Sequence, residues 1–246
     1  MNEKTRRGIA YGGYVRLVKP ILFRFKPDDV HHVMVRTAFW LSRRPVLLRI
    51  GTFWLRHTPT VNLQQTIQGI TFENPVGLAA GIDKNGQMTH VMQMVGAGFS
   101  TVGSVTFEPR IGNPKPWFYR LPRTKGIVVY AGMANQGLLQ ITPRLENRPK
   151  DFPVITSVAV VAQKKSDSDE QIINDVKKAV SHVVDKAICE ILEINISCPN
   201  VQDDEPFSDP MRLEKLLSAL DDMKLEKPVF LKMPNRRDWT RFEPIL

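Results

Sequence analysis

The sequence has 246 residues, of which 42% are hydrophobic and 24% charged, and these proportions are ordinary for a folded domain with a sizeable core. Its two cysteines exclude a disulfide scaffold and any metal site built from several cysteines, and we expect no metal. No apolar run reaches the ~20 residues that a spanning helix needs, and no signal peptide is visible. These features predict a cytoplasmic protein with one barrel-sized domain and an appendage.

The net charge of +9 is carried entirely by residues 1–60. This segment holds 12 of the 34 basic residues and three of the 25 acidic ones, which leaves 22 of each for the rest of the chain. Aromatic residues such as Trp40 and Trp54 are interleaved with the basic ones, a combination that suits a bilayer interface. The pattern favours a membrane surface as partner, on the inner face of the cell membrane, over a solvated helical hairpin covering a barrel. We expect no nucleic acid.

Three amphipathic stretches predict that residues 1–57 form a helical segment. Apolar residues recur at helical spacing within residues 10–26. Pro27 and the two acids after it mark a stop and a new helix start, since acids favour a helix N-terminus. A second apolar stripe runs through residues 30–41, and Pro45 begins a third short helix through Trp54.

The rest of the chain, residues 58–246, alternates short apolar runs with amphipathic stretches. The amphipathic stretches lie near residues 87–95, 169–187 and 211–223. Alternation of this kind predicts a parallel α/β sheet with covered faces, either doubly wound or a TIM-type (β/α)₈ barrel. Five strands fall short of eight, so a barrel would be truncated after about five strands. The five predicted strands are Val76–Ala80, Phe99–Val105, Val154–Val161, Ile191–Ile196 and Val229–Met233.

Polar and small residues follow the first two predicted strands, where function collects in parallel α/β folds. Ala80 and Gly81 would let a flat ligand approach the backbone, and Lys84 would bring a cation to the same place. A plain turn with a surface lysine is the alternative. Ser104 ends the second strand with a hydroxyl that suits phosphate or ring oxygens, although ordinary turn chemistry explains it too.

The last two predicted strands end in a denser set of polar residues. Asn195, Ser197 and Cys198 fall near one strand tip, and a cysteine with a lowered pKa can act as a general base. Lys232 lies inside an apolar strand, where burial is costly without an anionic partner. The alternatives are a buried turn cysteine and a lysine that extends to solvent.

Several motifs in order resemble one family, the membrane-associated, quinone-dependent dihydroorotate dehydrogenases. Residues 74–86 read NPVGLAAGIDKNG, residues 103–106 read GSVT, residues 112–116 read GNPKP, and residues 195–200 read NISCPN. The N-terminal helices are similar to those of the membrane-bound class. The resemblance covers nearly the whole chain.

The resemblance implies oxidation of dihydroorotate to orotate in pyrimidine biosynthesis, with FMN as cofactor and a membrane quinone as acceptor. By this resemblance Cys198 is the catalytic base, and the N-terminal helices form the quinone tunnel. Lys84 and Asn195 would contact both flavin and substrate, and Asn200 the substrate. The remaining flavin contacts would come from Ala80, Gly81, Ser104 and Lys232.

Three positions depart from the family pattern and keep other functions open. The membrane-bound class has serine as its base, and Val129 and Ala159 stand where the family has asparagines. Losing two amides weakens recognition of a hydrogen-bonding ligand. The alternatives are a non-catalytic or truncated homologue on the membrane surface and a flavin reductase with another substrate.

Overall fold

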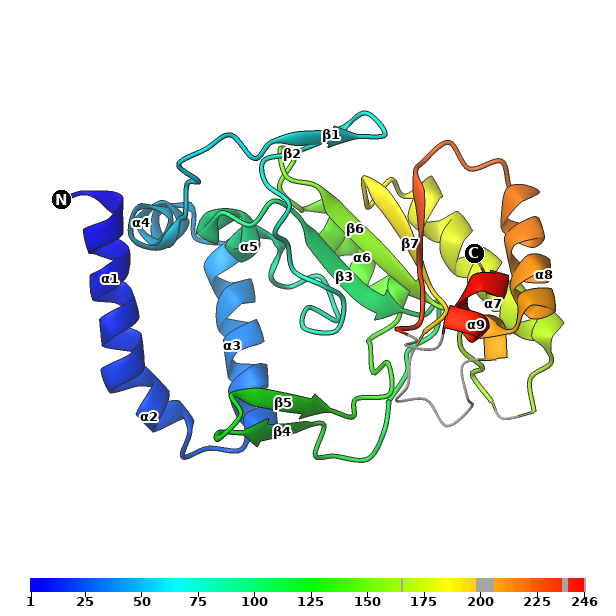
Figure 1. Ribbon diagram of the computed structural model, residues 1–246, viewed down its shortest axis with the longest axis horizontal. Coiled ribbons are helices and arrows are strands. Elements are labelled where there is room, and N and C mark those ends of the chain that lie inside the picture. The colour runs from blue at the N-terminus through cyan, green and yellow to red at the C-terminus, as the bar shows by residue number, and fades with distance from the viewer. Residues whose placement is uncertain (165, 198–205, 236–238, 246) are drawn as a thin grey trace.

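A computed structural model describes residues 1–164, 166–197, 206–235 and 239–245 of the chain (Figure 1). Cys198 and Asn200, two of the predicted site residues, lie outside the described residues. The architecture is α/β, with helices at the N-terminal end of the chain and a parallel sheet after them.

Four strands form the central sheet in the order β3-β6-β7-β8, and every neighbouring pair is parallel. All residues of β3 and β6 are buried. The parallel pairing confirms the predicted sheet, and the complete burial of β3 and β6 is typical of sheets covered on both faces. The strands are β3 (Ser100–Val105), β6 (Val154–Ala159), β7 (Ile191–Asn195) and β8 (Val229–Lys232).

The predicted first strand, Val76–Ala80, is wrong as a strand. It makes a single parallel bridge, Leu78 to Ser100, in which the Thr101 amide donates to the Leu78 carbonyl at 2.7 Å. Val76 is 70% exposed, and no other described strand pairs with this segment. With hydrogen bonds on one side only, the segment stays irregular, and the described sheet has four strands rather than five.

Helices α5 to α8 pack with the sheet around one large core. Their bounds are Thr89–Val95 (α5), Leu138–Glu146 (α6), Asp169–Asp185 (α7) and Pro210–Asp221 (α8). Val158, Leu192 and Ile194 from the strands share this core with Ile141 and Leu216 from the helices. The helices predicted near residues 87–95, 169–187 and 211–223 are confirmed as α5, α7 and α8. Helix α6 was not predicted from the sequence, and it contains Pro143.

The other face of the sheet is closed near the start of its strands. Ile155 and Ile191 pack there with Phe72, which lies in the hairpin of β1 (Gln65–Ile67) and β2 (Ile70–Phe72). Phe99 and Phe230 join this cluster. This cluster covers only the first part of each strand on this face. Every second residue further along the same strand also points to this face, nearer the strand ends.

The N-terminal helices are present as predicted, although the first begins earlier, at Glu3. They are α1 (Glu3–Gly13), a π-helical turn (Tyr14–Val18), α2 (Lys19–Leu22), α3 (Pro27–Ser42) and α4 (Pro45–Leu55). None of the helices among the described residues is long and apolar enough to span a bilayer. The division into domains at residues 57 and 58 stays a prediction. Short helical turns lie before α8, at Pro206–Ser208, and after β8, at α9 (Trp239–Phe242) and Glu243–Ile245.

A buried carboxylate joins α3 to the hairpin of β4 (Phe118–Leu121) and β5 (Gly126–Val129), which lies beside it in Figure 1. Asp28 is only 6% exposed and accepts hydrogen bonds from the backbone amides of Trp117 at 2.9 Å and Phe118 at 3.4 Å. The His31 ring packs 4.7 Å from the Phe118 ring. Arg120 completes the contact by donating to the carbonyl of Phe25 at 3.0 Å.

We expect Asp28→Ala to lower the free energy of unfolding by about 1–3 kcal/mol, because two backbone amides lose their acceptor. Asp29→Ala is the matched control, since Asp29 is the exposed neighbour in the same helical turn and its loss should cost less than about 0.5 kcal/mol. Urea denaturation of both variants measures the difference. Equal destabilisation would contradict the role of Asp28.

Candidate active site

A chain of buried polar side chains crosses three strands near their C-terminal ends. The Asn195 Nδ2 donates to Ser104 Oγ at 2.7 Å, and Ser104 Oγ shares a 2.8 Å hydrogen bond with Ser157 Oγ. The Asn195 Oδ1 accepts from the Ser197 amide at 3.1 Å. Asn195 therefore has a fixed orientation, since both ends of its amide are engaged.

Ser157 was missed by the sequence reasoning. Its signal was a hydroxyl inside the apolar run Val154–Val161, two residues before Ala159 and therefore on the same face of the strand.

The sheet register brings Lys232 to the same level as Asn195. Asn195 pairs directly with Lys232 on β8 and with Ala159 on β6. Lys232 is half-buried at the end of its strand. Amide and ammonium donors thus stand on adjacent strands, an arrangement that suits the polar edge of a planar ligand.

The segment after Ala80 approaches the sheet closely and leaves room beside it. The Gly81 amide donates to the Gly103 carbonyl at 2.7 Å, which places Gly81 beside the residue preceding Ser104. Gly81 has a φ of 110°, and a Cβ added to it would meet nothing within 4 Å. The open space next to bare backbone fits the close approach of a flat ring.

Asp83 fixes the turn that carries Lys84. Its carboxylate is fully buried and accepts hydrogen bonds from the amides of Gln87 and Met88, both at 2.8 Å. Its carbonyl accepts from the Gly103 amide at 2.9 Å. Burial raises the pKa of Asp83, while the backbone hydrogen bonds oppose that shift.

Lys84 is another cation of the site, and it is half-buried beside α3. Its ammonium donates to the Gly81 carbonyl and lies 5.2 Å from the centroid of the Phe118 ring. Burial lowers the pKa of Lys84 to about 8, against the opposing charges of Asp83 and Asp28. Burial also lowers the pKa of His31 to about 4, with Lys84 the next cause. At neutral pH, therefore, Lys84 is charged and His31 is neutral.

The side chains around Ala159, the β6 partner of Asn195, are apolar. Met133, Ala159 and Val161 form a small buried cluster, and Val129 lies exposed at the end of β5. These side chains offer no hydrogen bond to a ligand, so recognition depends on the donors of the neighbouring strands. Cys189, the described cysteine, is buried in the core, and burial raises its pKa to about 11, which excludes a role as a base at neutral pH.

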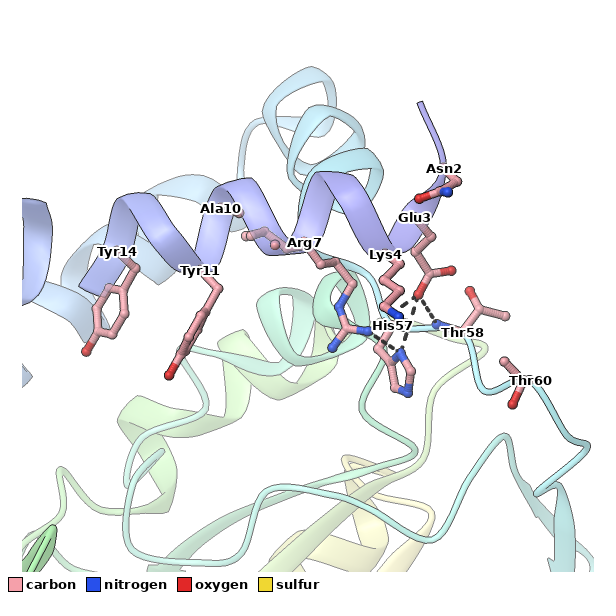
Figure 2. Close-up of a pocket in the computed structure, with 12 residues that line it drawn as sticks. Asn2, Glu3, Lys4, Arg7, Ala10, Tyr11, Tyr14, His57, Thr58 and Thr60 are labelled. Carbon is pink, nitrogen blue, oxygen red and sulfur yellow. Dashed lines mark hydrogen bonds and ion pairs between the residues drawn. The ribbon is translucent and has the colours of Figure 1, made fainter. Parts of the chain in front are cut away.

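A separate cavity of about 910 Å³ runs along α1 (Figure 2). Tyr11 and Tyr14 project from the same side of the helix, and Leu55 adds an apolar wall. One end is polar, where Glu3 accepts from the Thr58 amide at 3.1 Å and contacts His57 at 3.3 Å. The cavity belongs to the N-terminal helices rather than to the strand ends.

Comparisons with known proteins point to one family. The model of the dihydroorotate dehydrogenase family matches residues 62–244. A protein of Chloroflexus aurantiacus named dihydroorotate dehydrogenase (quinone) is 32% identical over all of this chain and 68% of its own length. A protein of the same name from Nitratiruptor is 33% identical over 88% of this chain and 60% of its own length.

The solved structures agree on the fold. The DHODH of Eimeria tenella in complex with ferulenol superposes with a TM-score of 0.69 at 23% identity, over 87% of this chain and 62% of its own. Its ligand-free form gives a TM-score of 0.68. The present chain spans 60–68% of the length of the relatives described here.

We expect Lys84 to lose its charge with a midpoint near pH 8, since burial favours its neutral form. An anion held by Lys84 should then bind well below this pH and weakly above it. NMR of ¹³C-methylated lysines across pH 6–11 measures the midpoint, and Lys84→Arg identifies the resonance. A midpoint above 10 would contradict the buried position of the ammonium.

Proposed function

Because this chain belongs to the dihydroorotate dehydrogenase family, we propose that it serves the oxidation of dihydroorotate to orotate in pyrimidine biosynthesis, with FMN as cofactor and a quinone as acceptor. The observation that carries the proposal is the set of hydrogen-bond donors that lie side by side at the strand ends. Asn195 pairs with Lys232 on the neighbouring strand and donates a hydrogen bond to Ser104. When bound, FMN supplies the acceptor for the hydride.

The described residues fit a flavin. Gly81 leaves open space beside bare backbone, and its neighbour Ala80 adds only a methyl group. Ser104 and Asn195 place a hydroxyl and an amide near this segment. Lys232 would stabilise negative charge on the ring edge, and Lys84 would face both the ring and the substrate carboxylate.

The substrate chemistry rests on two residues outside the described part of the chain. By family resemblance Cys198 removes the C5 proton of dihydroorotate, and Asn200 donates to the substrate ring. A thiol needs a lowered pKa for this task.

Colour tests the proposal directly. We expect the purified chain to bind flavin, seen as absorbance near 450 nm, and dihydroorotate to bleach it without oxygen. Cys198→Ala should slow bleaching at least about 100-fold, the lower end of what a general base contributes. Cys189→Ala is the matched control and should bleach at the parent rate per bound flavin, because Cys189 is buried in the core.

Two outcomes would support the alternatives. A folded, colourless chain that still binds vesicles indicates a non-catalytic homologue. Bound flavin that dihydroorotate leaves oxidised indicates a flavin reductase with another substrate. The apolar Val129 and Ala159 favour the non-catalytic homologue.

The N-terminal helices are proposed to contact a membrane surface and its quinone, on the inner face of the cell membrane. These helices expose many apolar side chains, and basic side chains lie among the apolar ones. Arg43 lies 4.4 Å from the centroid of the Phe39 ring, and Arg44 lies 5.4 Å from that of the Trp40 ring. The exposed apolar residues include Leu17, Ile21, Val33, Met34, Val46, Ile50 and Phe53. The cavity along α1 in Figure 2 supports a place for the apolar quinone.

Vesicle binding tests the membrane proposal. Leu17 is 68% exposed on the N-terminal helices, and we expect it to insert into the bilayer interface. Leu17→Glu should therefore weaken binding to anionic vesicles at least about tenfold, because apolar burial is lost and negative charge is added. Leu139→Glu is the matched control, because Leu139 is 62% exposed on α6. Cosedimentation measures both, and equal loss in the two variants would contradict the assignment to the N-terminal helices.

A further inference from the structure

A cavity of about 580 Å³ lies between α3 and the loops at the strand ends, on the side of Lys84 that faces α3. Asp29, His32 and Arg36 line it from the helix. Lys84, Arg110, Lys115, Trp117 and Gln136 are among the residues that line it from the loops. Lys84 therefore belongs both to the wall of this cavity and to the turn beside Gly81.

The described wall of the cavity carries an excess of cations. Among the described residues that line it, Arg36, Lys84, Arg110 and Lys115 stand against one acid, Asp29. Arg110 is anchored, since it donates to the carbonyls of Gly132 at 3.2 Å and Ala162 at 2.7 Å. Its charge is thus fixed in place, while the side chains of Arg36 and Lys115 are exposed at the rim. A concave surface with an excess of one charge concentrates ions of the opposite charge.

An aromatic wall stands beside these cations. The Trp117 indole N–H donates to the Asn113 carbonyl at 2.7 Å, which fixes the ring. The Lys115 ammonium lies 5.0 Å from the centroid of that ring, and the His32 ring stacks 6.3 Å from it. A fixed flat ring flanked by cations suits a small planar anion, because stacking and charge attraction act together.

We propose that this cavity is a reception site for a small planar carboxylate, which Arg36 and Lys115 draw in and pass to Lys84. For the identity of the carboxylate the inference rests on the proposed function, which makes it dihydroorotate or orotate. The site differs from the strand-end donors, because its rim comes from α3 and the loop before β4.

The Trp117 indole N–H signal in a ¹H–¹⁵N NMR spectrum reports directly on this wall, and Trp117→Phe assigns it. Orotate should shift the signal saturably, whereas uracil, the same ring without the carboxylate, should not. Lys115→Ala and Arg36→Ala should each weaken the orotate effect at least about fivefold. Lys150→Ala, which removes an exposed lysine outside the cavity, is the matched control and should leave it unchanged.

The inference is overturned if orotate leaves the Trp117 signal in place, if uracil shifts it equally, or if the two rim variants behave like Lys150→Ala. These results are separable from those of the flavin test. If dihydroorotate bleaches the flavin but orotate does not shift the Trp117 signal, the reception site is contradicted and the proposed function is supported. If orotate shifts the signal and uracil does not, but dihydroorotate does not bleach the flavin, the reception site is supported and the proposed function is contradicted.

Discussion

The parallel register of the sheet is the constraint on which the site depends. Because all four strands run in one direction, their ends meet at one edge, and a shift of one residue would turn each side chain to the opposite face. The observed register places Ala159, Asn195 and Lys232 at one level. The closed cluster of Phe72, Ile155 and Ile191 near the strand starts opposes such a shift, since it would expose these residues.

A second constraint links the N-terminal helices to the charge of the site. Asp28 holds the start of β4 and therefore Phe118, whose ring packs against His31 and lies near the Lys84 ammonium. The same carboxylate opposes the fall in the pKa of Lys84 caused by burial. Movement of α3 would change both the position and the protonation of Lys84, so the helical segment and the site are physically coupled through one hairpin.

The sequence was sufficient for the elements with strong local signals. Helix α7 begins at a capping box of Ser168 and Gln171, and β-branched residues recur in the strands β3, β6 and β7. It was insufficient where the outcome depends on partners. Val76–Ala80 has the composition of a strand but pairs on one side only. Helix α6 contains Pro143, which argues against a helix, but the burial of Leu138 and Ile141 stabilises it.

The site shows the same division between local and long-range information. Motifs near strand ends led to the prediction of Gly81, Lys84, Ser104, Asn195 and Lys232, because small and polar residues stand out in apolar surroundings. Their roles stay predictions. Nothing local indicated that Ser157 bonds to Ser104 or that Asp28 reaches β4 across some ninety residues. The neutral state of His31 also depends on such contacts, since burial against Phe118 and the charge of Lys84 both disfavour its protonation. Between Lys84 and His31, therefore, Lys84 carries the positive charge, which gives a carboxylate a defined place to bind on the side of the strand ends that faces α3.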